Sequence, residues 1–284
     1  MINNSKALDK LFYQMPVEKL KDNKLHYIDL HIIDHCNHNC ARCVKFAPLC
    51  KERIIPDSNK ILQDLTQLAK MTDNTLDGIS ILGGEPLISP DIILYMKACR
   101  ALFPNTAITI VTNGLAIPSM PEEFFTVLKE YNIWLSISKF YKKEFYCNII
   151  KTLKKHNCYN RTVFQGLEPF GCVMFVQMDL DETGSQNKKE MFNKCPNKNG
   201  YITLKDGKLW SCPTSCMKYI LNKYFGTDFK QFDKDGVDIY NHTQEEAVEL
   251  LRQPKESCKY CTEYGLNRLY FPEPTKKEKS EWIK

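Results

Sequence analysis

Short apolar runs alternate with amphipathic stretches between residue 25 and about residue 177 of this 284-residue chain. Runs rich in β-branched residues and bounded by polar turns predict strands, whereas apolar residues that recur every three or four positions predict helices. The expected strands are residues 25–33, 78–82, 106–111, 132–138 and 161–165, and the expected helices are residues 58–71, 90–102, 121–131 and 143–155.

This regular alternation predicts an α/β fold, with a parallel sheet, right-handed crossovers and helices on the outside. Five or six such units are too few for a closed eight-stranded barrel, so we expect a partial (β/α)6 TIM-like barrel. Asp57 or Ser58 is expected to cap the first helix. Ser89 followed by Pro90 is expected to cap the second, with proline at its first position.

The pattern changes after about residue 180. Residues 179–190 are polar and predict a loop, and residues 201–210 predict a hairpin that turns at Asp206-Gly207. Helices are expected at about 214–224 and 243–252, the second beginning with a capping box at Thr243 and Glu246. We therefore expect an N-terminal extension over 1–24, the barrel over 25–180 and a small cysteine-rich module over 181–284.

Charge and hydropathy exclude several classes of protein. The 39 basic and 34 acidic residues leave a net charge of +5, which is small for this length and makes nucleic-acid binding unlikely as a primary role. The first ten residues lack the apolar stretch of a signal peptide, and no apolar run approaches the roughly 18 residues of a membrane span. We expect a cytoplasmic protein with no membrane segment.

The chain contains 13 cysteines, and in a chain without an export signal clustered cysteines bind metal more often than they form disulfides. Cys36, Cys40 and Cys43 follow the first expected strand, at the edge where α/β folds place their chemistry. Three thiolates can hold three irons of a cubane cluster and leave the fourth iron open. Zinc is the alternative, and it would need His35 or His38 as a further ligand.

A second set of cysteines lies in the last third of the chain. The expected hairpin is flanked by two of them, and a C-x2-C pair follows much later: the set is Cys195, Cys212, Cys258 and Cys261. Four thiolates can close either a [4Fe–4S] cluster or a zinc site, and their spacing alone does not distinguish the two.

The first cysteine run resembles the C-x3-C-x2-C hallmark of the radical S-adenosylmethionine (radical SAM) superfamily, and residues 81–86 resemble its GGEP motif. The resemblance implies that the cluster's open iron binds the amino and carboxylate groups of S-adenosylmethionine (SAM). It also implies cofactor contacts from the ends of the second to fourth strands, namely Gly83, Gly84, Glu85, Pro86, Thr112, Asn113, Ser136 and Ser138.

The motif residues have specific implied roles. The two glycines would let the backbone approach the cofactor closely, and Glu85 or a neighbouring carbonyl would accept hydrogen bonds from the methionine ammonium. Two features depart from the family pattern. Arg42 replaces the aromatic residue common before the third cysteine, so that either its guanidinium or Phe46 would stack near adenine. Residues 165–167 are only a weak match to the glycine-rich motif near the fifth strand.

The second cysteine set resembles the shortened auxiliary-cluster module called a twitch domain, a relative of the SPASM domain. This resemblance implies one auxiliary [4Fe–4S] cluster held by the four cysteines. Cys172 and Cys216 remain as hypothetical hydrogen-atom donors.

The implied reaction is reductive cleavage of SAM to a 5′-deoxyadenosyl radical, which abstracts hydrogen from a small-molecule substrate such as a sugar or nucleotide-sugar. Electrons would come from a reductase such as flavodoxin or ferredoxin. Oxidation would follow if the auxiliary cluster accepted the remaining electron, and epimerisation if a thiol quenched the substrate radical. The net reaction would be that of an oxidoreductase or an epimerase.

Three other interpretations remain. The first is a peptide-modifying enzyme of ribosomal peptide maturation, although 24 residues before the first strand are too few for a leader-recognition domain, which a partner would then supply. RNA is a less favoured substrate because the charge is modest. The interpretation from a different class is a non-catalytic zinc-binding interaction module.

Overall fold

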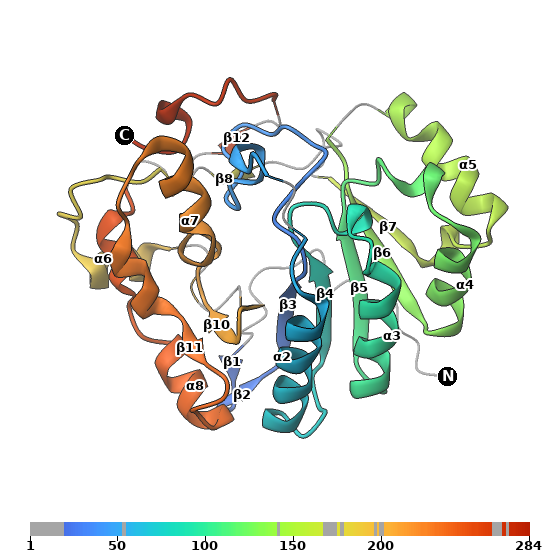
Figure 1. The fold of residues 1–284 in the computed structure, drawn as a ribbon, viewed down its shortest axis with the longest axis horizontal. Coiled ribbons are helices and arrows are strands. Elements are labelled where there is room, and N and C mark those ends of the chain that lie inside the picture. The colour runs from blue at the N-terminus through green and yellow to red at the C-terminus, as the bar shows by residue number, and fades with distance from the viewer. Residues whose placement is uncertain are drawn as a thin grey trace.

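The computed structural model describes residues 20–52, 55–140, 143–166, 175–176, 179–195, 198, 202–262, 269–270 and 273–284. Two short antiparallel ribbons lie outside the main sheet: β1 (Leu20–Lys21) pairs with β2 (Lys24–Leu25), and β8 (Phe175–Val176) pairs with β12 (Leu269–Tyr270). The remaining described strands form one sheet (Figure 1).

Five parallel strands form the first part of this sheet. They are β3 (Tyr27–His31), β4 (Gly78–Leu82), β5 (Ala107–Thr112), β6 (Ile133–Ser138) and β7 (Thr162–Gln165), each paired in parallel with the next. The helices between and beside them are α2 (Ser58–Met71), α3 (Ile92–Leu102), α4 (Glu122–Glu130) and α5 (Cys147–Lys155). The expected strands and helices are confirmed to within a few residues, and the parallel α/β core agrees with a partial barrel. The sixth unit stays a prediction.

The start of α2 is as expected, because the Asp57 side chain accepts a hydrogen bond from the backbone N–H of Asn59 at 3.0 Å. The expected cap of α3 is wrong. A short 3-10 turn ends at Ser89, whose backbone is extended, and α3 begins at Ile92 after Asp91. The residue before a proline disfavours helical backbone, so Pro90 separates the two elements here instead of starting the helix.

The loop expected over residues 179–190 is wrong at its end. A seven-residue helix, α6 (Lys188–Lys194), begins there. The side chain of Asn187 caps it by accepting hydrogen bonds from the backbone N–H groups of Lys189 and Glu190 at 3.1 and 3.2 Å. The polar composition of the segment concealed this capped helix.

The two faces of the parallel sheet differ in polarity, because successive side chains of a strand point to opposite sides. The outer face packs with the helices into the main apolar core, whose strand members include Ile28, Leu30, Ile79, Ile81, Ile108, Ile110, Leu135 and Ile137. The inner face carries polar side chains that are nevertheless buried: Asp29, His31, Thr109 and Ser136. A buried polar face is suited to a polar ligand, not to a second apolar core.

The expected hairpin is confirmed as β9 (Thr203–Lys205) and β10 (Lys208–Trp210). Asp206 and Gly207 have φ angles of 53° and 72°, the left-handed values that a two-residue type I′ turn requires. Strand β9 pairs in parallel with β3, and β11 (Val237–Asp238) pairs with β10. The sheet order is therefore β11-β10-β9-β3-β4-β5-β6-β7.

The hairpin turn is fixed to the barrel by Asp64 of α2. This buried carboxylate accepts hydrogen bonds from the backbone N–H of Gly207 and from the hydroxyl of Tyr240, both at 2.7 Å. Strands on both sides of residue 180, where the domain boundary was predicted, therefore belong to the same sheet.

The C-terminal region also contains α7 (Pro213–Phe225) and α8 (Gln244–Leu251), the latter with the expected capping box. A second apolar core combines this region with the first cysteine loop, and its members are Phe46, Leu49, Leu180, Trp210, Met217, Leu221, Phe229, Phe232 and Trp282, among others. The first cysteine loop therefore packs against the C-terminal third of the chain.

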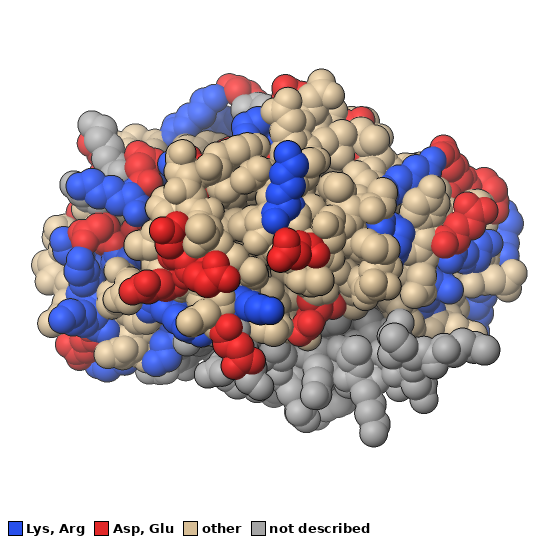
Figure 2. Space-filling model, turned by 90° about the horizontal axis from the view of Figure 1, so that it is seen from below, with Lys and Arg blue, Asp and Glu red and all other residues tan. Residues whose placement is uncertain are grey.

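Basic and acidic side chains are mixed over the face shown in Figure 2. This arrangement agrees with the small net charge and offers no uniformly basic surface there. No helix among the described residues is long and apolar enough to cross a membrane.

Candidate functional site

The loop that carries Cys36, Cys40 and Cys43 begins at the carboxyl end of β3, as expected. Burial is the largest cause that raises the pKa of Cys36 to about 12, and nearby Glu85 and Cys43 contribute to the rise. Burial, followed by the charges of Cys43 and Cys36, raises the pKa of Cys40. The three thiols are close enough to influence one another, and a metal must displace their protons to bind.

The loop holds its shape through local contacts. The backbone N–H of His38 donates to the Cys36 Sγ at 3.3 Å, and the His38 Nδ1 lies 2.7 Å from the Cys40 Sγ. Arg42 and Phe46 adopt left-handed backbone conformations with φ of 59° and 53°. These two residues therefore mark the sharp turns on either side of Cys43.

Gly83 and Gly84 follow β4 and lie directly against the start of the cysteine loop. A Cβ on Gly83 would lie 2.3 Å from the Ile33 carbonyl oxygen, and one on Gly84 would lie 2.2 Å from that of His35. The backbone N–H groups of Gly84 and Glu85 donate to these same oxygens at 2.6 and 2.9 Å. Glycine is required here because two backbone segments meet. A contact with the cofactor stays a prediction.

Glu85 joins the ends of two strands, a role that sequence reasoning missed. Its buried carboxylate accepts hydrogen bonds from the Thr112 hydroxyl at 2.5 Å, the Asn113 N–H at 2.8 Å and the Leu87 N–H at 3.0 Å. Burial raises the pKa of Glu85 to about 7, although the three hydrogen bonds act to lower it. Pro86 follows in the 3-10 turn.

Asn113, the residue after β5, contacts the cysteine loop, whereas the cofactor contacts of Thr112 and Asn113 stay predictions. The Asn113 side chain donates to the Asn37 side-chain oxygen at 2.8 Å and lies 3.8 Å from the Cys36 Sγ. On β6 the Ser136 hydroxyl is buried on the inner face without a hydrogen-bond partner in the described structure. Ser138 follows at the partly exposed strand end.

A segment near the end of the chain binds the cysteine loop along its length. The N–H of Ala41 donates to the Glu273 carbonyl at 2.8 Å, and the N–H of Thr275 donates to the Asn39 carbonyl at 2.9 Å. The indole N–H of Trp282 donates to the Cys43 carbonyl at 3.0 Å. We call residues 273–284 the clamp segment. Its polar sequence gave no signal of this contact.

The second set of cysteines comes together at one cavity. A cavity of about 430 Å³, counting space open to solvent, is lined by Cys195, Cys212, Cys258 and Cys261, together with Met191, Phe192, Lys198, Ser211, Lys255 and Ser257. Burial, then the neighbouring Cys195, raises the pKa of Cys212 to about 11. Burial also dominates the rise in the pKa of Cys258 to about 12. The four thiols that sequence spacing grouped therefore share one site.

Asp235 organises the backbone around this cavity. Its buried carboxylate accepts hydrogen bonds from the hydroxyl of Ser215 at 2.8 Å and from the backbone N–H groups of Glu256 and Ser257 at 2.9 and 3.3 Å. Ser215 lies three residues after Cys212, and Ser257 immediately precedes Cys258. The carboxylate thereby ties two cysteine-bearing segments together.

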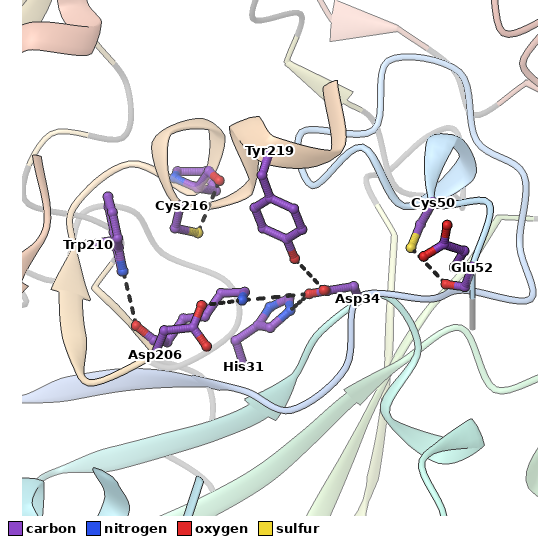
Figure 3. A network of polar contacts seen from close by, with 10 residues as sticks. His31, Asp34, Cys50, Glu52, Asp206, Trp210, Cys216 and Tyr219 are labelled. Atoms are coloured by element: carbon purple, nitrogen blue, oxygen red, sulfur yellow. Dashed lines mark hydrogen bonds and ion pairs between the residues drawn. The ribbon is translucent and has the colours of Figure 1, made fainter. Parts of the chain in front are cut away.

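Cys216 does not line that cavity. Its buried thiol donates to the Pro213 carbonyl at 3.2 Å and faces a polar network between α7 and β3 (Figure 3). Burial raises the pKa of Cys216 to about 12, whereas Lys45 and Lys205 act to lower it. Cys172 lies outside the described residues.

The polar network centres on Asp34. Its carboxylate accepts hydrogen bonds from the His31 Nε2 at 2.8 Å and from the Tyr219 hydroxyl, and the Lys205 ammonium lies 4.0 Å away (Figure 3). Burial acts to raise the pKa of Asp34, but these hydrogen bonds and charges outweigh it and lower the value to about 2. Burial lowers the pKa of His31 to about 4. At neutral pH, Asp34 is therefore ionised and His31 is neutral.

Among the described residues, no three His, Cys, Asp or Glu side chains are arranged to hold a single metal ion. The second cysteine set instead lines one larger cavity.

A family model of the Radical SAM superfamily matches residues 30–157. GTP 3′,8-cyclase of Alkaliphilus oremlandii (strain OhILAs) is 27% identical over 121 residues, which cover 41% of this chain and 37% of that protein. GTP 3′,8-cyclase of Lactiplantibacillus plantarum (strain ATCC BAA-793 / NCIMB 8826 / WCFS1) is 29% identical over 109 residues, which cover 37% of this chain and 32% of that protein. The match thus spans about a third of the length of these curated relatives.

The fold is also similar to that of a solved protein. The crystal structure of BtrN in complex with AdoMet and 2-DOIA has a TM-score of 0.51 and 17% identity, with 86% of this chain and 96% of that chain covered. At this identity the likeness shows the fold alone. The family model supports the Radical SAM superfamily over residues 30–157, and the solved structure supports the α/β fold.

Proposed function

We propose that this chain, as a radical SAM enzyme, holds a second iron–sulfur cluster and oxidises or epimerises a small hydroxylated molecule of the sugar or nucleotide-sugar kind. The observation that carries the proposal is the convergence of Cys195, Cys212, Cys258 and Cys261 on one cavity. Four thiols from separate segments at one cavity can close either a [4Fe–4S] cluster or a zinc site, and the match of residues 30–157 to the Radical SAM family model favours the cluster. We accordingly propose that residues 181–284 are a twitch-type module.

The donor set of the first loop fits a cluster with one open iron. Three thiols lie on one loop, and the loop is held by backbone contacts to Gly84 and by the amide of Asn113. We propose Cys36, Cys40 and Cys43 as the ligands. We propose that SAM binds beside them, with Gly83, Pro86, Thr112 and Ser138 as further members of its pocket.

Bound at these sites, the first cluster would supply the electron that cleaves SAM to the 5′-deoxyadenosyl radical, which abstracts hydrogen. The second cluster would accept an electron from the substrate. The chain's own residues do the rest. The clamp segment and the second apolar core cover the loop and keep water away from it. The polar inner face of β3, β5 and β6 orients the substrate.

Cys216 supports epimerisation over oxidation. Its thiol faces the polar network between the two cysteine sets and keeps its proton at neutral pH, because its pKa is about 12. A protonated thiol can donate a hydrogen atom to a carbon radical, which leaves a thiyl radical on the sulfur. One electron from the flavodoxin or ferredoxin reductant, passed through the second cluster, and one proton from solvent would then restore the thiol. We propose Cys216 as that donor, with Cys172 as the second candidate. In oxidation, the substrate would instead lose a proton and pass an electron to the second cluster.

The test is anaerobic reconstitution with iron and sulfide. The proposal expects a brown protein with about eight irons per chain, the content of two [4Fe–4S] clusters, and 5′-deoxyadenosine formation from SAM after reduction by flavodoxin or ferredoxin. Triple replacement of Cys36, Cys40 and Cys43 by alanine should leave about four irons and no SAM cleavage. A colourless protein that holds only zinc would refute the proposal and establish a zinc-binding module.

The thiol donor has its own test. In D2O, wild-type enzyme should place deuterium from the exchangeable thiol in the epimerised product, and Cys216→Ala should not. Cys50→Ala serves as the control, because Cys50 is a partly exposed thiol whose Sγ donates to the Glu52 carbonyl at 3.2 Å. Normal epimerisation by the Cys216 variant would assign the role elsewhere.

A further inference from the structure

Several buried polar atoms on the inner face of the sheet have no hydrogen-bond partner among the described residues. They include the His31 Nδ1 on β3, the Thr109 hydroxyl on β5 and the Ser136 hydroxyl on β6. The sheet register places these three residues on the same face. Buried polar groups in native proteins are nearly always paired with protein, water or ligand, so this face is built to receive polar groups from elsewhere.

The Lys45 ammonium is the charged member of this set. It is buried, and its Nζ has no hydrogen-bond partner in the part of the chain that the structure describes. Its electrostatic neighbours are Asp29 of β3, Cys216 of α7, Cys43 of the first loop and Asp34. The Nζ therefore lies between the polar inner face and α7, next to the cysteine loop. Burial lowers the pKa of Lys45, although these neighbours act to raise it. A buried Nζ that lacks a hydrogen-bond acceptor calls for a ligand that supplies acceptor oxygens, as a phosphate or a carboxylate does.

His31 supplies the complementary acceptor. Its Nε2 bonds to the ionised Asp34, so the neutral ring carries its proton on Nε2 and leaves Nδ1 as an acceptor. Lys45 and Lys205 both act to lower the pKa of His31, after the larger effect of burial. Lys205 is already paired with Asp206 at 2.7 Å. Of these two lysines, Lys45 is the one whose Nζ has no hydrogen-bond partner among the described residues.

We propose that Lys45 and His31 form a substrate subsite for an anionic, hydroxylated small molecule, in which the Lys45 ammonium holds a phosphate or carboxylate and the His31 Nδ1 accepts a hydrogen bond from a hydroxyl. The inference rests on the proposed radical SAM function for its location beside the cysteine loop. It narrows the substrate class to a molecule that carries a negative charge near the reacting carbon. Cys216 lies near the same ammonium.

The experiment is titration calorimetry on the reconstituted, SAM-loaded enzyme, with inorganic phosphate, glycerol 3-phosphate and uncharged glycerol as probes. Wild-type enzyme should bind both phosphates saturably and should bind glycerol at least tenfold more weakly. Lys45→Met should weaken phosphate binding at least tenfold, whereas Lys45→Arg should retain it within threefold. Lys223→Met is the matched control, because Lys223 is an exposed α7 lysine paired with Glu52 at 2.7 Å.

Two outcomes would overturn the subsite. One is equal phosphate binding by wild type and Lys45→Met, or no binding by wild type. The other is a tenfold loss of SAM affinity in Lys45→Met with unchanged phosphate binding, which would assign the ammonium to the cofactor's carboxylate. Iron content and circular dichroism identify a variant that fails to fold, and Lys45→Arg then carries the test.

The same samples separate this inference from the proposed function. If wild-type enzyme cleaves SAM but shows no preference for phosphates over glycerol, only the subsite fails. If wild-type enzyme binds no iron–sulfur cluster and does not cleave SAM, the proposed function itself fails.

Discussion

Replacement of Glu85 by glutamine tests whether the buried Glu85 carboxyl, which joins the ends of β4 and β5, makes the unfolding free energy depend on pH. The pKa of the buried Glu85 is raised from 4.5 to about 7, mainly by burial. Below pH 4.5 the carboxyl is protonated in both the folded and the unfolded chain. Between pH 4.5 and 7 the unfolded chain releases this proton while the folded chain keeps it, so the stability that Glu85 contributes falls as the pH rises.

The size of the effect follows from the same shift. A rise from 4.5 to about 7 corresponds to a loss of about 3 kcal/mol of unfolding free energy across this range. Glutamine cannot ionise, and its amide nitrogen faces the Asn113 N–H without being able to accept from it. The variant should therefore be less stable than wild type at pH 5, and the difference should shrink by about 3 kcal/mol by pH 8.

The assay is urea unfolding of cluster-free protein under reducing conditions, followed by tryptophan fluorescence at pH 5, 6, 7 and 8. Glu123→Gln is the control, because Glu123 is an exposed α4 carboxylate paired with Lys97. The stability change of this control measures the effect of removing one surface charge and is subtracted from that of the Glu85 variant. A wild-type-to-variant difference that stays constant with pH would refute the reasoning about burial of Glu85.

Three further predictions concern the two cysteine sites. Gly84→Ala should lose the iron of the first cluster, because its Cβ would lie 2.2 Å from a backbone oxygen. Gly226→Ala is the control, because its Cβ would have no atom within 4 Å. This variant should keep that iron and lose only about 1 kcal/mol of unfolding free energy to its left-handed backbone. Trp282→Phe should remove the hydrogen bond to Cys43, lower unfolding free energy by about 1–3 kcal/mol and speed iron loss to a chelator. Asp235→Asn should lower the iron content from about eight to about four per chain and leave SAM cleavage after reduction intact.

Each of these outcomes can fail in a specific way. Full iron in the Gly84 variant would mean that the cysteine loop can move away from β4. Unchanged chelation kinetics in the Trp282 variant would mean that the clamp segment does not hold the loop. Full iron in the Asp235 variant would mean that the second cavity keeps its shape without this carboxylate.

Much of the barrel could be predicted from the sequence, because residues 78–82 and 58–71 have periodicities that match one element each and are bounded by strong turn or cap residues. The Ser89-Pro90 cap could not be predicted correctly, since the same dipeptide also separates a 3-10 turn from a helix. Pairing of β9 with β3 depends on contacts across more than 170 residues, and no local pattern reports them.

Some residues of the candidate site could be predicted from the sequence and others could not, because only some of them have a local sequence pattern. Cysteine spacing identifies ligands because thiols are rare and chemically specific, and the structure brings the second set together at one cavity. Glu85 and Trp282 of the clamp segment bind backbone groups of their partners, which every residue possesses, so these contacts have no sequence signature. His31 did have a sequence signature. It follows Asp29 by two positions, with apolar residues between and after them, and this alternation is the period-two pattern of a strand with one polar face.

The clamp segment also sets an order of events during biosynthesis. Trp282 lies 239 residues after Cys43, the residue whose carbonyl it holds. At ribosomal rates of roughly 5–20 residues per second, the three loop thiols wait roughly 10–50 s before this partner is made. Throughout that interval the loop lacks its cover on the nascent chain. The covered form of the cysteine loop can therefore arise only after the clamp segment has been synthesised.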